Sequence, residues 1–154
     1  MFTMRRANQP NKMIVRFVGS HIKAAAEAER VCFSVPWSET SLKLLTADPG
    51  FGLVCEIDGE FAAYGGMMVI ADEAQLLNVA TLPEYRRQGL AREILAGLYS
   101  EARSRGAVTM TLEVRESNSA ARTLYLNEGF YEIGVRSNYY QNPREAEIIM
   151  DKHL

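Results

Sequence analysis

The stretch LPEYRRQGLAREILAGL, residues 82–98, joins a polar loop to the start of an amphipathic helix. After the loop, apolar residues follow Leu90 at distances of four, five, eight and twelve residues, which places them on one helix face. These residues are Ile94, Leu95, Leu98 and Ala102. The start of a helix carries unpaired backbone N–H groups and the positive end of the macrodipole. Because anions bind at such ends, the arginines and glycine of this loop predict an anion-binding site.

Upstream of the loop, the pattern predicts four strands and two helices. The expected elements are a strand at 13–18, helices at 20–33 and from 38 onward, a hairpin at 51–70 and a strand at 73–82. Ser20 and Ser38 are of the type that caps a helix start. Asp58-Gly59 is a strong turn signal between two extended runs, which predicts the hairpin.

Downstream of the loop, the pattern predicts three strands and a short helix. The expected elements are a strand at 107–115, a helix at 117–129 and strands at 130–140 and 145–154. Gly106 and Gly129 follow the two helices as C-terminal caps. Strand alternation puts Glu113 on a polar face. The complete order, β-α-α-β-β-β-α-β-α-β-β, predicts one mixed α/β domain.

Composition restricts the function classes. The chain has 154 residues, 47% of them hydrophobic, which suits one domain with a core. A formal charge of -2 argues against direct nucleic-acid binding. Cys32 and Cys55 lie in apolar stretches and are expected to be buried, inert thiols. The cysteine and histidine spacings resemble no zinc site, so no metal is expected.

The N-terminal segment is polar and unpatterned. Residues 1–12 are expected to form a loose tail, with the domain spanning 13–154. Two arginines near the start are followed by no apolar region, so the segment is not a secretory signal. Since no apolar run approaches membrane-spanning length, we expect a cytoplasmic protein with no membrane partner.

The loop after the central strand suits a pyrophosphate. Gly89 has no Cβ, so a phosphate can approach the backbone closely, and Ala91 is small enough for the same purpose. The glycine spacing matches neither the dinucleotide fingerprint nor the P-loop. Taken alone, the loop is equally well explained as exposed arginines at a helix start.

The element order and the motif Arg86-x-x-Gly89-x-Ala91 resemble the GNAT superfamily of acyl-coenzyme-A-dependent N-acetyltransferases. Within it, the chain resembles the ribosomal-protein alanine N-acetyltransferases. The matching segments are PWSE (36–39), LLNVAT (76–81), YRRQGLA (85–91), LEVRESNSAARTLY (112–125), GF (129–130), NYY (138–140) and REAEIIM (144–150). The resemblance implies a single α/β domain with a mixed, mostly antiparallel sheet, a splayed central strand pair and about four flanking helices.

The resemblance also implies residue roles. Glu113 matches the family's general base and Tyr125 its general acid. The residues implied in binding acetyl-coenzyme A are Val79, Ala80, Thr81, Arg87, Gln88, Gly89, Leu90, Ala91, Arg92 and Asn118. Trp37, Tyr139 and Tyr140 lie in matched segments outside the coenzyme motif and are implied in binding the acceptor.

Each of these residues also has a structural interpretation. From the pattern alone, Glu113 is a solvated carboxylate on a half-exposed strand, and Tyr125 is a rim or core aromatic. Asn118 is a helix N-cap, whereas Trp37 and the Tyr139-Tyr140 pair are packing residues. The joint match to one family favours the functional roles.

The resulting hypothesis is that the protein transfers an acetyl group directly from acetyl-coenzyme A to a protein N-terminal amine. The expected acceptor is the N-terminal alanine of a small-subunit ribosomal protein. The alternatives are a GNAT enzyme that acetylates lysine, a polyamine or another small amine, and a non-catalytic acetyl-coenzyme-A-binding module. The sequence leaves the oligomeric state open.

The C-terminal motif departs from the family pattern. The family's usual order is Arg-Glu-Asp-Ala-aliphatic, whereas Ala146 here stands in the aspartate's place and Glu147 in the alanine's. If that aspartate helps to hold a basic acceptor peptide, the acceptor preference of this chain differs.

Overall fold

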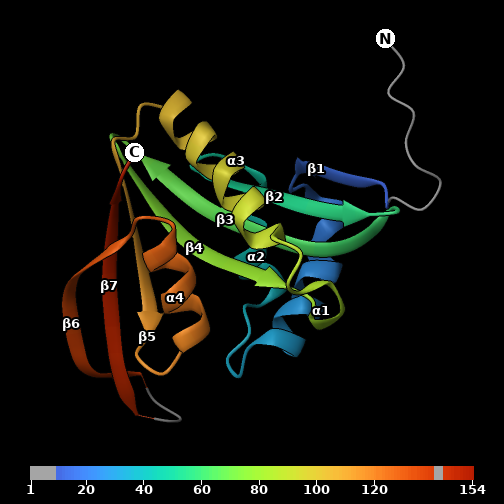
Figure 1. Cartoon of the computed structure of the whole chain (residues 1–154). Helices are drawn as coiled ribbons and strands as arrows, with labels where there is room; N and C mark the ends of the chain where they lie inside the picture. The colour runs from blue at the N-terminus through green and yellow to red at the C-terminus, as the bar shows by residue number, and fades with distance from the viewer. Residues whose placement is uncertain (1–9, 141–143) are drawn as a thin grey trace.

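The fold is organised around one sheet (Figure 1). The computed structural model describes residues 10–140 and 144–154. Within them, seven strands form one sheet in the order β1-β2-β3-β4-β5-β7-β6. The strands are β1 (Lys12–Arg16), β2 (Gly50–Ile57), β3 (Glu60–Ile70), β4 (Glu73–Thr81), β5 (Thr109–Arg115), β6 (Tyr131–Tyr140) and β7 (Glu145–His153). The helices are α1 (Ile22–Cys32), α2 (Glu39–Leu42), α3 (Leu90–Ser104) and α4 (Ser119–Asn127).

The predicted order of elements is confirmed, as are most of the predicted helix ends. The Ser38 side chain accepts a hydrogen bond from the Ser41 backbone N–H at the start of α2. Gly106 and Gly129, with φ of 90° and 92°, follow α3 and α4 in the left-handed conformation.

One predicted helix start is wrong, and the first strand begins one residue earlier than predicted. Ser20 does not cap α1, because it lies inside the 3₁₀ turn Gly19–His21, in which His21 Nδ1 accepts from the Val18 N–H at 3.0 Å. Lys12, assigned to the tail, is already paired with Ile57 in the sheet. The Asn11 backbone N–H donates to Asp58 Oδ1 at 2.8 Å, and residues 1–9 of the predicted tail lie outside the described residues.

Strands β4 and β5 pair over a short distance and then separate. They run parallel, and only Glu73, Ala74 and Gln75 of β4 have partners in β5 among the described residues. All other strand pairs are antiparallel. Gly66 of β3 pairs with Asn78 and Met67 pairs with Leu76, so Leu77 is an extra residue that forms a bulge in β4, and bulges bend the strand that carries them. The predicted splayed central pair is therefore confirmed.

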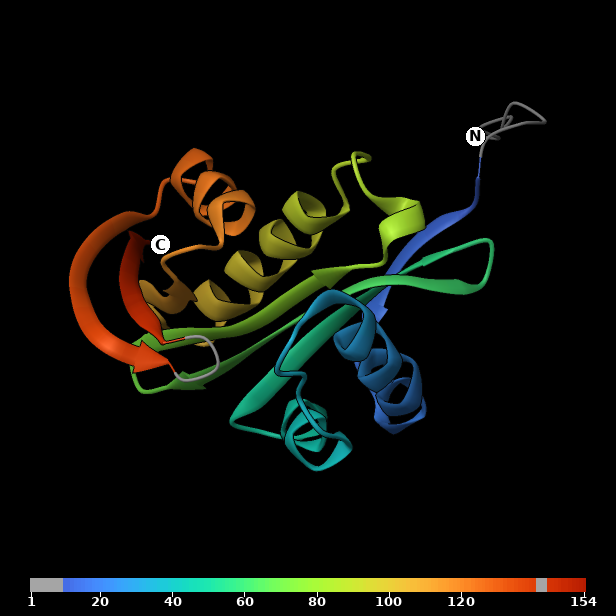
Figure 2. The same ribbon diagram turned by 90° about the horizontal axis from the view of Figure 1, so that it is seen from below.

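Helices cover both faces of the sheet. Figure 2 shows α3 and α4 on one face, here called the α3 face, and α1 and α2 on the other, the α1 face. The predicted apolar stripe of α3 is buried on the α3 face together with Met110, Leu112 and Val114 of β5. A Cβ on Gly65 would lie 2.6 Å from Ile94 Cγ2, so α3 packs directly on the β3 backbone. None of the described helices is long and apolar enough to cross a membrane.

A buried carboxylate connects the α1 face to the central strands. Glu29 of α1 is fully buried and accepts hydrogen bonds from the Tyr64 hydroxyl of β3 and from Asn78 Nδ2 of β4. The Trp37 backbone N–H donates to the same carboxylate at 3.4 Å. Burial raises the pKa of Glu29, and these donors oppose that rise. The network therefore fixes the loop between α1 and α2 against β4.

Replacing Tyr64 with phenylalanine should destabilise the fold. The variant removes one donor from the Glu29 carboxylate, and hydrogen bonds to buried charged groups contribute about 1.5–3 kcal/mol each. We expect a loss of that size in the free energy of unfolding, measured by denaturant titration. Tyr131→Phe is the matched control, because its hydroxyl contacts His153 at the surface and its loss should cost less than about 0.5 kcal/mol. Equal losses in both variants would contradict a stabilising role for the network.

Candidate active site

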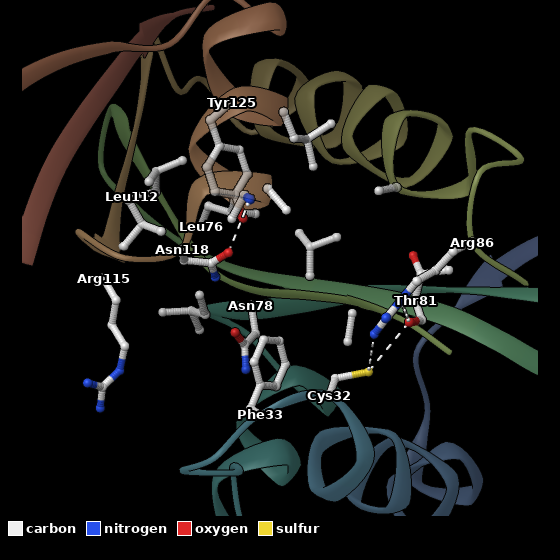
Figure 3. A pocket seen from close by; sticks show the side chains of 18 of the residues that line it. Cys32, Phe33, Leu76, Asn78, Thr81, Arg86, Leu112, Arg115, Asn118 and Tyr125 are labelled. Atoms are coloured by element: carbon white, nitrogen blue, oxygen red, sulfur yellow. Dashed lines mark hydrogen bonds between the residues drawn. The ribbon is translucent and has the colours of Figure 1, made fainter. Parts of the chain in front are cut away.

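A cavity of about 840 Å³ lies where β4 and β5 separate. Residues from both faces of the sheet line it: the loop before α3 and helix α4 from the α3 face, and the segment after α1 from the α1 face. Figure 3 draws Asn118 and Tyr125 on one side of this cavity and Thr81, Arg86 and Cys32 on another. The cavity therefore passes through the gap in the sheet, so two molecules can reach it from opposite faces.

The start of α3 presents backbone donors to the cavity. Gly89 is the N-cap residue with φ of 76°, and Arg87 before it has φ of 64°, so the loop contains two left-handed residues. A glycine cap has no side chain to accept from the first turn, and no side-chain cap is present among the described residues. Gly89, Leu90, Ala91 and Arg92 all line the cavity. This backbone geometry, with its positive dipole end, suits a phosphate group.

Arginines add positive charge to the same end of the cavity. Arg86, Arg87 and Arg92 are among the lining residues. Arg92 Nε lies 3.3 Å from Glu128 Oε2, and Arg86 Nε donates to the Thr81 carbonyl at 3.3 Å. Gln88, the remaining predicted member of the loop, is not in contact with the cavity.

The separated edge of β4 forms a second wall. Val79, Ala80 and Thr81 all line the cavity, and β5 offers them no strand partner. Cys32 also lines it, and its Sγ donates to the Thr81 carbonyl at 3.4 Å. The prediction of two buried thiols is therefore correct for Cys55 but wrong for Cys32, because α1 ends at the rim of the cavity.

Helix α4 contributes Asn118 and Tyr125. Asn118 caps the helix, with its Oδ1 accepting from the Ala121 N–H at 3.2 Å, and it also lines the cavity. Tyr125 lies two turns further on, is 8% exposed and packs edge-on against Phe130 at 5.5 Å. Burial raises the pKa of Tyr125 to about 12, so the phenol stays protonated at neutral pH.

Glu113 enters the cavity from the opposite face. Its strand neighbours Leu112 and Val114 are buried in the core of the α3 face, so the Glu113 side chain projects toward the α1 face. It is exposed and lines the cavity. Glu113 and Tyr125 thus approach one cavity from different faces of the sheet.

Aromatic and charged side chains border the Glu113 side. Trp37 and Tyr140 line the cavity, whereas Tyr139 does not and packs edge-on against Tyr140 at 5.1 Å. The Arg115 guanidinium lies 4.1 Å from the Tyr140 ring centroid and 2.9 Å from Glu145 Oε1. Hydrogen bonds from Ser117 and Arg115 hold the pKa of Glu145 below its usual value.

Sequence reasoning missed several lining residues. Arg115 could have been predicted from the sequence, because strand alternation places it on the same polar face of β5 as Glu113. Asn78 lies in the matched segment beside Val79, whereas Cys32 and Phe33 carried no signal, since only the packing of α1 beside β4 brings them to the cavity. Among the described residues, no group of three or more His, Cys, Asp or Glu side chains could hold a metal ion.

Comparison with known proteins agrees with this geometry. The model of the acetyltransferase (GNAT) family matches residues 22–130. The [ribosomal protein bS18]-alanine N-acetyltransferase of Escherichia coli K12 is 40% identical over 131 residues, covering 84% of this chain and 88% of that protein. A putative enzyme of the same name from Bacillus subtilis is 36% identical over 80% of this chain and 83% of its own length. The crystal structure of the E. coli ribosomal-protein-S18-alanine N-acetyltransferase superposes with a TM-score of 0.86 at 36% identity, covering 93% and 94% of the two chains.

The chain therefore belongs to the acetyltransferase (GNAT) family. The predicted GNAT fold, the resemblance to ribosomal-protein alanine N-acetyltransferases and the assignment as an acetyl-coenzyme-A-dependent N-acetyltransferase are confirmed at the level of the family.

Replacing Gly89 with alanine should weaken coenzyme A binding. A left-handed conformation costs a non-glycine residue about 1–2 kcal/mol, so the loop would relax away from φ of 76° and turn its N–H groups aside. We expect a roughly tenfold or greater rise in the Kd for coenzyme A, measured by calorimetry. Gly59→Ala is the matched control, because Gly59 has φ of 81° and equal open space but lies in the β2–β3 turn. If both variants lost stability equally and bound coenzyme A equally well, the loop would not be the anion site.

Proposed function

We propose that the protein transfers the acetyl group of acetyl-coenzyme A to a protein N-terminal α-amine, that of an alanine-led small-subunit ribosomal protein. The main support for this proposal is the cavity that passes between β4 and β5. Glu113 lies on its α1 face and Tyr125 on its α3 face. The relatives at 36–40% identity, named for the alanine of bS18, support this acceptor.

Acetyl-coenzyme A is expected to bind from the α3 face. Its pyrophosphate would lie on the uncapped N–H groups that follow Gly89, with Arg87 and Arg92 beside it. Asn118 would contact the coenzyme from the start of α4. The free edge of β4 at Val79, Ala80 and Thr81 would hold the pantetheine and polarise the thioester carbonyl, as oxyanion donors do.

The acceptor amine needs only a modest base. An α-amine with a pKa of about 7.7–8.0 is roughly a tenth neutral near pH 7, whereas a lysine offers roughly one part in 2,500. In the proposed step, Glu113 takes one proton from the amine, directly or through water, as the N–C bond forms and the C–S bond breaks. Attack is direct in a ternary complex, without a covalent enzyme intermediate.

Tyr125 would serve the departing sulfur. Its buried phenol remains protonated, and it can donate a hydrogen bond to the sulfur as negative charge develops there. A pKa of about 12 makes complete proton release costlier than for an exposed phenol, by about 1.4 kcal/mol per unit. Tyr125 would therefore transfer its proton to the sulfur late in the reaction, after the C–S bond has broken and the thiolate has formed.

The acceptor would enter from the α1 face. Trp37 and Tyr140 border this entrance, with Tyr139 packed behind Tyr140. We propose that these rings hold the first residues of the acceptor chain and leave coenzyme binding unaffected.

An acceptor assay tests the function. The substrates are an alanine-led basic peptide and a copy with a blocked N-terminus that keeps one lysine. We expect thiol release from acetyl-coenzyme A with the free peptide alone, and mass spectrometry should locate the acetyl group on the α-amine. Transfer to the lysine alone would make the protein a side-chain acetyltransferase. Coenzyme binding without transfer to any amine, polyamines included, would indicate a non-catalytic binding module.

Single substitutions test the two catalytic roles. Glu113→Gln and Tyr125→Phe should each lower kcat by about 10²–10⁴-fold, the usual contribution of a general base or acid, with little change in the Kd for coenzyme A. Glu116→Gln is the control for the carboxylate, because Glu116 is exposed just beyond β5. Tyr99→Phe is the control for the phenol, since Tyr99 also contacts Phe130 but does not line the cavity. Unchanged kcat in either catalytic variant would remove that residue from the mechanism.

A further inference from the structure

Glu147 of β7 is a buried carboxylate with little compensation. Its side chain is 0% exposed, and among the described residues neither of its oxygens accepts a hydrogen bond from an N–H or hydroxyl donor, although the Glu113 carboxyl group interacts with it. Arg136 Nε lies 3.5 Å from Oε2, but the Arg136 side chain is 56% exposed. Burying a carboxylate without donors is costly, so this arrangement calls for a reason beyond packing.

The register of β5 and β7 places Glu147 beside Glu113. Glu147 pairs directly with Arg115, and Glu113 pairs with Ile149, so the two glutamates are diagonal neighbours on adjacent strands. Diagonal positions lie about 7–8 Å apart at the backbone, within reach of long side chains. Because Ile148 is buried in the core of the α3 face, the Glu147 side chain projects toward the α1 face, as Glu113 does.

The surroundings leave net negative charge at this pair. Among the described residues, the other ionisable groups around Glu147 are Arg115 of β5, Arg136, Tyr139 and Tyr140 of β6, and Glu145 of β7 itself. Arg115 pairs with Glu145 at 2.9 Å and lies over the Tyr140 ring. Arg136 lies 5.5 Å from the Tyr139 ring centroid as well as beside Glu147. Three carboxylates therefore share two guanidinium groups.

The pKa shifts of Glu147 and Tyr140 agree with a close approach of Glu147 to Glu113. Burial and then the neighbouring Glu113 raise the pKa of Glu147 to about 7, against the opposing charge of Arg136. Burial, Glu147 and Glu113 together raise the pKa of Tyr140 to about 12. After burial, the causes of the rise in the pKa of Glu147 come from Glu113, as expected of a carboxyl group that lies beside Glu147 on the adjacent strand.

We propose that Glu147 is a positioning residue that forms a carboxyl pair with Glu113, and that this pair takes up the proton of the acceptor amine. The inference rests on the proposed function for its chemistry and on the buried Glu147 carboxyl group for its geometry. Glu147 stands at the position where the family pattern given by the resemblance has alanine.

The proton balance of the reaction is unchanged by the pair. With both carboxylates ionised, the pair accepts one proton from the amine as the N–C bond forms, and that proton is then shared between Glu113 and Glu147. Tyr125 gives one proton to the sulfur and is reprotonated through solvent when the pair releases its own. A lone glutamate with a pKa of about 4.3 is a weak base, whereas a base that titrates near the working pH is stronger and still ionised.

The decisive kinetic test is the ratio of kcat/KM between the parent enzyme and Glu147→Gln as a function of pH. The acceptor amine titrates identically in both reactions, so it cancels in the ratio. Above pH 8 we expect the parent enzyme to be faster by roughly tenfold, because its base is stronger. Below pH 6 the pair already holds a proton, so the ratio should fall to about one or less. A ratio that does not vary with pH would overturn the proposal and leave Glu147 with a structural role.

Two further variants keep the test independent of folding defects. Asp151→Asn removes a carboxylate from the same strand and face, where it accepts from Thr111 Oγ1, and should give a pH-independent ratio. Arg136→Gln removes the cation beside the pair and should shift the acid limb of the profile to higher pH. An acid limb unchanged in Arg136→Gln would contradict the pairing even if Glu147→Gln failed to fold.

A titration without substrate separates this inference from the proposed function. In protein labelled with ¹³C at glutamate side-chain carboxyls, we expect NMR to show a carboxyl that titrates near neutral pH. The near-neutral step should disappear in both Glu147→Gln and Glu113→Gln, even if no acceptor has been identified. A near-neutral step that persists in Glu113→Gln would show that burial alone perturbs Glu147, and the pair would be refuted.

Discussion

The separation of β4 from β5 is the constraint on which the rest of the structure depends. Three residue pairs join the strands at one end, and beyond Gln75 the backbone edge of β4 lies open. Unpaired strand edges are normally costly inside a protein, because their polar groups need partners. β4 tolerates the opening because β3 pairs its other edge, and Glu29 fixes its Asn78 side chain from the α1 face. β5 is held in turn by β7.

The opening gives the protein one cavity with two entrances. A closed sheet would separate the α3 face from the α1 face, and groups on the two faces could not act on a single bond. With the gap present, the positive end of α3 lies on one side and the Glu113 carboxylate on the other. Strand alternation places Glu113 on the face opposite α4, the helix that carries Tyr125, since Leu112 and Val114 anchor β5 in the core of the α3 face.

Local pattern predicted most of the elements and the start of α3, because both depend on residues adjacent in the chain. Gly89, Asn118 and Ser38 occupy the cap positions expected of their types. The error at Ser20 has a local cause as well, since the His21 ring competes successfully for the turn. Cys32 could not be placed, because its neighbours at the cavity, Thr81 and Arg86, are about fifty residues away in the sequence.

The partners of charged groups were the least predictable part of the site. Glu113 was identified through its family motif and strand face, whereas Glu147 was noticed only as a departure from that motif. Its burial and its position beside Glu113 depend on the register of β5 with β7, which no short pattern encodes. Pairing of distant strands therefore determines which carboxylates interact, even where each strand is predicted correctly.

Two buried glutamates show how the same residue type takes on different roles. Glu29 accepts from a hydroxyl, an amide and a backbone N–H, so its charge is compensated and it fixes three segments of the chain. Glu147 lacks such donors among the described residues and has a second carboxylate nearby. The first arrangement fixes one geometry of the fold, whereas we propose that the second exchanges a proton. In that proposal, the cost of burying Glu147 is offset by its function, because its carboxyl group lies beside Glu113, which lines the cavity.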